Sequence, residues 1–269
     1  MTADLVDGGA ARISLLYHDV FEVSADESGF RGAAADRYKL VRADFEAHLD
    51  AVAEAQPLAA TSVLTGERRQ TFHITFDDGG SSSLAIADML ERRGWIGHFF
   101  IPTDFVGTQG FVDAAAIRQL AFRGHVVGSH SCSHPLAMSG LADGDLRREW
   151  RDSVAVLSDF LGTAVTCGAI PAGSYARRVA EAAEAAGLAH LYTSEPTVTP
   201  WRIGGLTLLG RFSIMGNTRP DMVATFARGD RRAIAAQRLA WGTKRAVRRI
   251  AGPLWVQARD LILRSRHAG

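Results

Sequence analysis

Residues 70–80 read QTFHITFDDGG, a run of mostly β-branched and aromatic residues that stops at two aspartates and two glycines. Such a run followed by turn residues is typical of a buried strand that ends in a tight turn. Asp77 and Asp78 therefore lie at the carboxyl end of a predicted strand. Because neighbouring residues leaving a strand point to opposite sides, we expect the two carboxylates to face different ways. A bound cation would let both stay ionised despite their mutual repulsion.

A second motif, HSCSHP at residues 130–135, supplies ligands for such a cation. It follows another predicted buried strand, VVGS at residues 126–129. The spacing of four predicts that His130 and His134 lie on one side of a helical turn. With Asp78 they would form a three-ligand site with open positions, which is typical of catalytic metal sites. The remaining carboxylate, that of Asp77, is then a natural general base for an attacking water.

Each motif alone has a simpler interpretation. Asp-Asp-Gly is commonly only a turn, and two histidines four residues apart are commonly only surface residues. Here both motifs follow predicted buried strands. We therefore interpret them together, as a metal site in which one carboxylate binds and the other reacts.

The two motifs resemble those of the polysaccharide deacetylases with NodB homology, also called carbohydrate esterase family 4. The resemblance runs from LYHD at residues 16–19 to IPAGSY at residues 170–175. It implies an α/β protein with a distorted, incomplete (β/α) barrel, a divalent metal and an amino-sugar substrate. The site residues that it implies are Asp77 as the base, Asp78, His130 and His134 as metal ligands, and Pro171, Gly173 and Tyr175 as one wall of the substrate groove. A backbone N–H near Tyr175 would stabilise the oxyanion.

The sequence departs from the family pattern in two places. The third motif often has an arginine two residues before its proline, paired with the base, and Ala169 stands at that position here. The task of that arginine is either unfilled or performed from elsewhere in the chain, and Arg211 is our candidate substitute, which we also count among the substrate-binding residues. A Leu-x-His motif that supplies the general acid in many members is also absent, and only His190 and His267 follow the second motif.

His18 is our candidate for the missing acid. It follows ISLLY at residues 13–17, a predicted buried first strand, so it lies on the same rim as the metal motifs. Family members with a Tyr-His opening, such as the poly-N-acetylglucosamine deacetylases, look like a rearranged version with the acid on that strand. A histidine that only caps the strand end is the alternative. A nearby metal would lower the pKa of His18, and Asp19 would raise it.

Strands and helices alternate along the rest of the chain. This order predicts a parallel sheet, and motifs at the carboxyl ends of several strands favour a barrel with its site on that rim. Residues 22–37 are predicted to be a polar loop that overlooks the site, and residues 194–200 and 215–220 are further loops suited to specificity. Helices are predicted at 41–52, 82–93, 113–122, 144–161 and 176–186, and further strands at 98–101, 166–170 and 189–193.

Length and composition favour one domain with one large core, since 47% of the 269 residues are hydrophobic. Cys132 and Cys167 have no CxxC spacing, which argues against a disulfide framework or a zinc knuckle. Residues 1–8 lack the basic start and apolar core of a signal peptide, and the sequence has no apolar run long enough for a membrane span. We therefore expect a cytoplasmic protein.

The charge is polarised along the chain. Residues 228–269 contain eleven Arg and Lys against two Asp, a net charge of +9, whereas residues 1–227 carry −8. We expect residues 1–227 to form the barrel and residues 228–269 a basic helical extension that packs on it. Basic helices with Trp and Leu can also bind anionic membranes, so peripheral contact with the inner leaflet stays open. Nucleic acid is not an expected partner, because no nucleic-acid-binding module is recognisable.

The expected function is removal of an N-acetyl or other small acyl group from an amino sugar that is nucleotide-linked, lipid-linked or part of an oligosaccharide. Zinc is the first choice of metal, and cobalt, nickel or iron would suit the same ligands. Two alternatives stay open. One is hydrolysis of a non-sugar amide or an O-acetyl ester, and the other is a metal-containing barrel that binds a glycan without turning it over.

Overall fold

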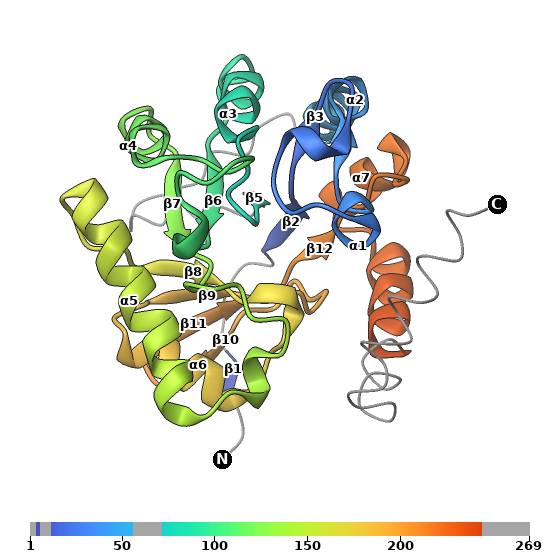
Figure 1. Ribbon diagram of the computed structural model, residues 1–269. Helices are drawn as coiled ribbons and strands as arrows, with labels where there is room; N and C mark the ends of the chain where they lie inside the picture. The colour runs from blue at the N-terminus through green and yellow to red at the C-terminus, as the bar shows by residue number, and fades with distance from the viewer. Residues whose placement is uncertain (1–3, 6–11, 56–71, 244–269) are drawn as a thin grey trace.

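The computed structural model describes residues 4–5, 12–55 and 72–243 (Figure 1). Within this part of the chain, one ten-stranded sheet forms the centre, and a separate pair, β3 and β4, lies beside it. The strands are β1 (Asp4–Leu5), β2 (Ile13–Tyr17), β3 (Val20–Phe21), β4 (Leu40–Val41), β5 (Phe72–Phe76), β6 (Gly97–Ile101), β7 (Val126–Ser129), β8 (Cys167–Ala169), β9 (His190–Tyr192), β10 (Trp201–Ile203), β11 (Leu206–Leu209) and β12 (Phe212–Ser213).

The large sheet curls without closing. Its strand order is β1-β10-β11-β9-β8-β7-β6-β5-β2-β12, so β1 and β12 are its two edges. Pairing is parallel from β11 through to β12, and helices cover the outer side (Figure 1). The predicted incomplete (β/α) barrel is thereby confirmed.

The antiparallel end of the sheet was not predicted. β10 pairs antiparallel with both β1 and β11, and β10 and β11 are joined by Gly204 and Gly205. Gly204 has a φ of 57°, which a glycine adopts without steric cost. The Gly-Gly pair between two apolar runs is the signal that could have indicated this hairpin.

The strands pack hydrophobic residues on both faces, as expected for a covered parallel sheet. Successive residues alternate between two clusters: Phe99 belongs to the large core between sheet and helices, and Phe100 to a smaller cluster on the other face. Leu191 and Tyr192 divide in the same way. The smaller cluster forms the floor under the carboxyl ends of the strands.

The helices agree with the predicted periodicity to within a few residues. α2 and α7 pack together beside β2 and β12 (Figure 1). The helices are α1 (Ala33–Asp36), α2 (Arg42–Ala55), α3 (Ser83–Glu91), α4 (Ala114–Phe122), α5 (Asp143–Leu161), α6 (Arg177–Ala185) and α7 (Pro220–Ala227), with short 3-10 helices η1 (Ala25–Glu27), η2 (Thr103–Phe105), η3 (Met138–Gly140) and η4 (Pro171–Gly173).

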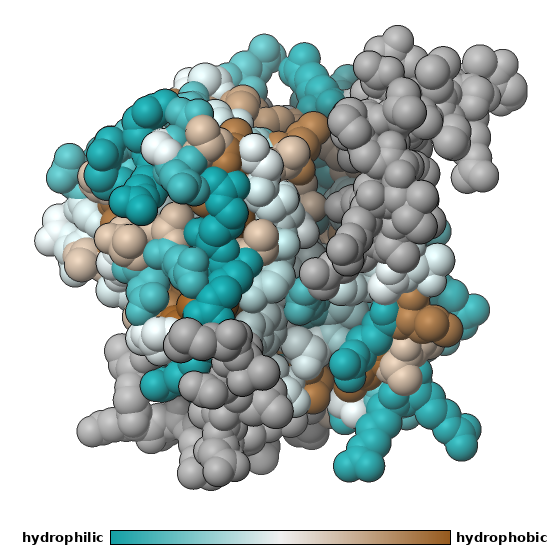
Figure 2. All heavy atoms as spheres, turned by 90° about the horizontal axis from the view of Figure 1, so that it is seen from below, coloured by the Kyte–Doolittle hydropathy of each residue, from teal (hydrophilic) through white to brown (hydrophobic). Residues whose placement is uncertain are grey.

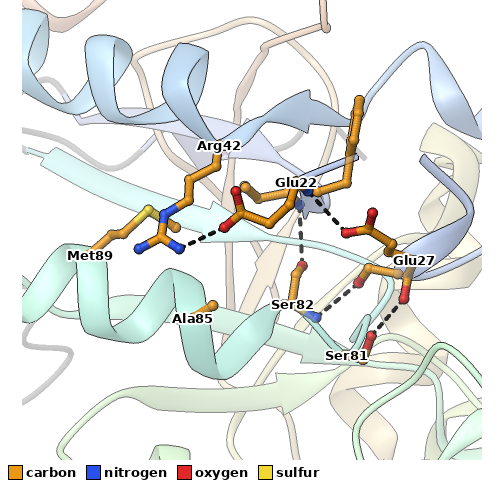
Figure 3. Close-up of a pocket in the computed structure, with 10 residues that line it drawn as sticks. Glu22, Glu27, Arg42, Ser81, Ser82, Ala85 and Met89 are labelled. Carbon is orange, nitrogen blue, oxygen red and sulfur yellow. Dashed lines mark hydrogen bonds and ion pairs between the residues drawn. The ribbon is translucent and has the colours of Figure 1, made fainter. Parts of the chain in front are cut away.

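The predicted polar loop at 22–37 is partly ordered by local structure. It contains η1 and α1 and lies between β3 and β4, which pair in parallel. Its outer side borders a cavity of about 240 Å³, where Arg42 pairs with Glu22 at 2.6 Å and the Ser81 hydroxyl donates to the Glu27 carbonyl oxygen at 3.0 Å (Figure 3). The charged groups of this cavity have partners of their own, since Arg42 and Glu22 pair and the Glu27 carboxylate accepts backbone N–H groups of residues 22–24, so it is not our candidate site.

The first part of the predicted C-terminal extension contacts the barrel. Residues 231–243 are helical, Ile234 is buried, and the Gln237 side chain donates to the Ser213 carbonyl oxygen at 3.0 Å. Residues 244–269, which carry much of the predicted basic charge, lie outside the described residues. Seen from below, the surface is largely hydrophilic with separate hydrophobic areas (Figure 2). Among the described helices, none combines the length and the apolar character needed to cross a bilayer.

Candidate functional site

The candidate residues gather at the carboxyl ends of parallel strands. His18 follows β2, Asp77 and Asp78 follow β5, His130 follows β7, and Pro171 comes two residues after β8. Parallel strands end at one rim, so residues that are more than a hundred positions apart in sequence meet there. This is the position at which α/β barrels place their sites.

Asp78, His130 and His134 form a compact set of potential metal ligands. Their ligand atoms all lie within 4.8 Å of one another. The Asp78 Oδ1 atom is 3.3 Å from Nε2 of His134 and 3.5 Å from Nε2 of His130. The geometry therefore brings together the three residues that the sequence predicted as ligands.

The tautomer of His130 also suits a metal. Its Nδ1 atom is 2.9 Å from the carbonyl oxygen of Ala169. A carbonyl only accepts hydrogen bonds, so Nδ1 carries a proton, and Nε2 is the ring nitrogen that faces Asp78. A hydrogen bond from the second ring nitrogen to a carbonyl is the usual support of a metal-ligating histidine. The donor set thus fits a divalent cation.

The predicted helical turn between the two histidines is wrong. Residues 130–134 have no regular secondary structure, and Ser131 and His134 have φ values of 64° and 54°. These left-handed residues fold the loop back, so that the two imidazole centroids lie 5.0 Å apart. Asp78 is also left-handed, with a φ of 71°, so a turn and not strand alternation separates it from Asp77. Left-handed non-glycine residues cluster at functional sites because only surrounding contacts maintain them.

Arg211 holds Asp77. Its guanidinium donates to both carboxylate oxygens, at 2.6 and 2.8 Å, and also to the Thr193 carbonyl oxygen at 3.0 Å. It lies over the rings of Phe100 and Tyr192, which belong to the floor of the barrel. Arg211 thus makes the pairing with the base that was expected of a substitute for the missing arginine. Its side chain is fully buried, so these contacts do not place it in a substrate groove.

The two carboxylates are kept ionised in different ways. Burial raises the pKa of Asp77, but the charges of Arg211 and His130 outweigh it, so that the pKa lies below its ordinary value. Burial likewise raises the pKa of Asp78, and hydrogen bonds with His130 and His134 lower it to well below the ordinary value. One carboxylate is therefore paired with a guanidinium and the other with the two histidines.

His18 has much weaker support. Its Nδ1 atom is buried without a hydrogen-bond partner among the described residues, and its ring lies 4.7 Å from that of Tyr38. Burial lowers the pKa of His18, and the charges of Asp78 and Asp77 only partly oppose this shift. The Asp19 carboxylate, expected to act on His18, instead accepts hydrogen bonds from Ser28 and Ser82 at 2.6 and 2.9 Å.

The segment that was predicted to line the substrate groove, residues 171–175, has a backbone that is already hydrogen-bonded. Pro171 is buried and begins η4, and Tyr175 packs its ring against Trp201 at 6.0 Å. The N–H of Tyr175 donates to the carbonyl oxygen of Gly173 at 2.9 Å, and that of Ser174 to Pro171 at 3.1 Å. The predicted oxyanion donor at Tyr175 is therefore committed to a local turn.

Aromatic residues beside the metal ligands were missed by sequence reasoning. Phe30 lies 4.7 Å from the ring of His134 and contacts Phe105 and Phe111 at 4.8 and 5.0 Å. Tyr38 and Phe30 both come from the segment between β3 and β4. Aromatic residues in a predicted polar loop are the signal that could have identified them.

Comparison with known proteins gives the same result as the geometry. The family model described as polysaccharide deacetylase matches residues 65–191. YxkH of Bacillus subtilis, which is named as a polysaccharide deacetylase, is 23% identical over 191 residues, covering 68% of this chain and 64% of YxkH. The peptidoglycan-N-acetylmuramic acid deacetylase PdaA of the same organism is 29% identical over 82 residues, covering 30% of each. The chain thus matches less than two thirds of the length of either relative.

Solved structures share the fold. A polysaccharide deacetylase from Bacillus cereus has a TM-score of 0.66 at 18% identity, covering 81% of this chain and 69% of its own. IcaB from Ammonifex degensii has a TM-score of 0.66 at 21% identity, covering 82% and 98%. The Streptococcus pyogenes deacetylase PplD, solved in complex with acetate, has a TM-score of 0.64 at 17% identity, covering 81% and 99%. Family model, named relatives, curled sheet and motif positions agree, and we conclude that residues 65–191 of this chain are similar to the polysaccharide deacetylases.

Proposed function

We propose that this protein is a metal-dependent hydrolase that removes an N-acetyl, or another small acyl, group from an amino sugar. The observation that supports this most directly is the division of labour between two adjacent carboxylates. Asp78 lies against both histidines, whereas Asp77 is bound by the Arg211 guanidinium. A purely structural metal site would have no use for a second buried carboxylate of this kind.

Asp78, His130 and His134 would hold the metal. When bound there, a divalent cation would polarise the acyl carbonyl and favour ionisation of the attacking water. Zinc is our first choice, and cobalt, nickel or iron would suit two histidines and one carboxylate equally well. Asp78 and His130 are buried and His134 is half-buried, so surrounding contacts restrict the positions of their ligand atoms.

The other residues would move protons. Asp77 is ionised at neutral pH, because its pKa is lowered, and would accept a proton from the attacking water as general base. Arg211 would keep that carboxylate oriented. His18 would donate a proton to the departing amine as general acid, on the other side of the reacting group. Pro171, Gly173 and Tyr175 would line the groove that holds the sugar.

The substrate class rests on the family and on a named relative. PdaA is named for an amino sugar that carries an N-acetyl group, and we propose an N-acetylated sugar for this chain as well. Nucleotide-linked, lipid-linked and oligosaccharide sugars are the candidates. We further propose a cytoplasmic location, with contact to an anionic membrane through the basic C-terminal residues. Cell fractionation and vesicle flotation test these two points.

Two alternatives predict different outcomes. A hydrolase of O-acetyl esters would release an alcohol, whose departure depends less on a general acid than that of an amine, whereas a hydrolase of non-sugar amides would still have to protonate an amine. A glycan-binding barrel would bind the metal and a sugar and release no product. The weak support of His18 is the observation that keeps both alternatives in view.

Acetate release tests the proposal. The zinc-loaded protein would be incubated with N-acetylated nucleotide sugars, lipid-linked sugars and chito-oligosaccharides, and in parallel with O-acetylated xylo-oligosaccharides. We expect acetate and a free amine from at least one N-acetylated sugar, and loss of release after chelation that zinc restores. Release only from O-acetyl esters would favour the ester alternative. Sugar binding without any release would favour the binding barrel.

A further inference from the structure

The histidine loop, residues 130–134, needs outside support because it is irregular and strained. Two of its five residues are left-handed without being glycine, and such conformations persist only when neighbouring contacts fix them. Its backbone N–H groups are therefore informative, since each needs a hydrogen-bond partner.

Three of these N–H groups bind within or beside the loop. The N–H of His130 donates to the Ile101 carbonyl oxygen at 3.0 Å. The N–H of Ser131 donates to the Ser129 hydroxyl, and that of His134 to the Ser131 hydroxyl, both at 3.2 Å. These bonds fix the two ends of the loop. The N–H groups in its middle, those of Cys132 and Ser133, need acceptors from another part of the fold.

Glu149, in the middle of α5, holds that middle. Its Oε2 atom accepts the N–H groups of Cys132 and Ser133, both at 2.9 Å, and its Oε1 atom accepts the Ser133 hydroxyl at 2.6 Å. The Cys132 thiol also donates to the Glu149 carbonyl oxygen at 3.4 Å. A carboxylate accepts two converging N–H groups more strongly than a neutral group does.

The same carboxylate lies in an acidic surface cavity of about 280 Å³, which Asp104 and Asp152 also line. Its negative charge could therefore act through the local field as well as through hydrogen bonds. Comparing Asp152 with Glu149 separates the effect of charge from that of hydrogen bonding. Asp152 carries the same charge on the same helix, but its side chain bonds Arg151 at 2.7 Å. Only Glu149 of the two contacts the histidine loop.

We propose that Glu149 is a positioning residue that fixes the histidine loop from outside the barrel, so that the Nε2 atoms of His130 and His134 face Asp78. Glu149 does not touch the reacting groups. It acts through the loop, by bonding the two N–H groups that lie between the ligands. The proposal rests on the metal site proposed above, but the shape of the loop can be measured without any metal.

The test compares Glu149→Ala, Glu149→Gln and the matched charge control Asp152→Ala in the metal-free full-length protein. We expect Glu149→Ala to speed amide hydrogen exchange at Cys132 and Ser133 at least tenfold. Its zinc Kd should rise at least tenfold, as for other residues that support metal ligands, and the absorption spectrum of its cobalt form should change. Glu149→Gln keeps one oxygen for the N–H groups and an amide for Ser133, so it should stay within threefold of wild type. The amide exchange and zinc Kd of Asp152→Ala should also stay within threefold of wild type.

Four results decide the proposal. Unchanged exchange in Glu149→Ala overturns it, and so does an equal effect of Asp152→Ala, which would assign the effect to charge. A Glu149→Gln variant as impaired as Glu149→Ala also overturns the hydrogen-bond account. Ser133→Ala removes one of the three hydrogen bonds to the Glu149 carboxylate without changing α5. If Glu149→Ala fails to fold, a smaller increase in amide exchange at Cys132 and Ser133 in the Ser133→Ala variant supports the proposal. Wild type that binds no zinc contradicts the proposed function, while the exchange data still decide the role of Glu149.

Discussion

Asp77 and His18, the proposed base and acid on the rim of the barrel, differ in how many contacts hold them in place. On one side, Asp77 is buried and bound at both oxygens by Arg211, which is itself held by the Thr193 carbonyl and two aromatic rings. On the other side, His18 has a buried Nδ1 atom with no partner in the described chain and one ring contact, to Tyr38.

This difference follows from the tasks proposed for the two groups. Both groups change protonation state in each cycle, but they start it in opposite states. The base has to be ionised when the substrate binds, and a buried charge persists only when it is paired. The acid has to be protonated at that point, and a guanidinium partner like that of Asp77 would oppose a protonated histidine. The base side is therefore built as a rigid ion pair, and the acid side as a histidine whose charge is set by its surroundings.

The largest effect is expected when the ion pair is broken. Arg211→Met leaves the buried Asp77 charge without its partner, so the free energy of unfolding should fall by about 3–5 kcal/mol and the pKa of Asp77 should rise. Urea unfolding measures the loss. The matched control is Arg219→Met, which removes an exposed pair with Asp221 and should cost about 1 kcal/mol or less. Equal effects of the two variants would contradict a structural role of the buried pair.

Removing the acid should affect turnover and not stability. His18→Ala deletes a side chain whose Nδ1 atom has no hydrogen-bond partner among the described residues, so the free energy of unfolding should change little. In contrast, kcat should fall by about 10²- to 10⁴-fold, the range for one general acid. A substrate with a better leaving group should recover part of the rate in this variant. Full activity of His18→Ala would exclude His18 as the acid.

The pH profile tests the two protonation states together. The pKa of Asp77 lies below its ordinary value, so the base is ionised throughout the neutral range. Burial lowers the pKa of His18 below its ordinary value, so the fraction of its acidic form falls as the pH rises through the neutral range. We expect kcat/KM to decline with rising pH in the neutral range, and this decline to be absent in His18→Ala. An increase through pH 7 would instead assign His18 the role of a base.

The smallest effect is expected at the ring that contacts the acid. Tyr38→Ala removes the contact with His18, and a ring pair contributes about 0.5–1.5 kcal/mol, which corresponds to roughly a 2- to 10-fold loss of kcat/KM. Tyr38→Phe keeps the ring and should retain wild-type activity. If Tyr38→Phe were as impaired as Tyr38→Ala, the hydroxyl and not the ring would be the functional part.

The sequence predicts what depends on local pattern. The strands at residues 72–76 and 126–129 show as β-branched and aromatic runs before turn residues, and the incomplete barrel follows from their alternation with helices. The helix-like spacing of His130 and His134, by contrast, does not distinguish a helical turn from a loop folded by a left-handed Ser131. Only the contacts around that loop decide between them.

Long-range contacts explain the other differences. The ion pair of Asp77 joins residues 134 positions apart, so the sequence could offer Arg211 as a candidate for the place left by Ala169 but could not show which groups its guanidinium contacts. The N–H of Tyr175 is used by a turn that depends on the conformation of Ser174. Phe30, which lies beside His134, packs against Phe105 and Phe111 from a distant segment that it meets only in the fold.

The central claim is that, of two adjacent carboxylates, Asp78 binds the metal and Asp77 reacts. The most direct test measures zinc content and acetate release for Asp77→Asn and Asp78→Asn side by side, with a substrate that wild type accepts. The account predicts that Asp77→Asn retains zinc and loses turnover, whereas Asp78→Asn loses zinc and turnover together. Loss of zinc in Asp77→Asn, or turnover that survives in it, would contradict the account.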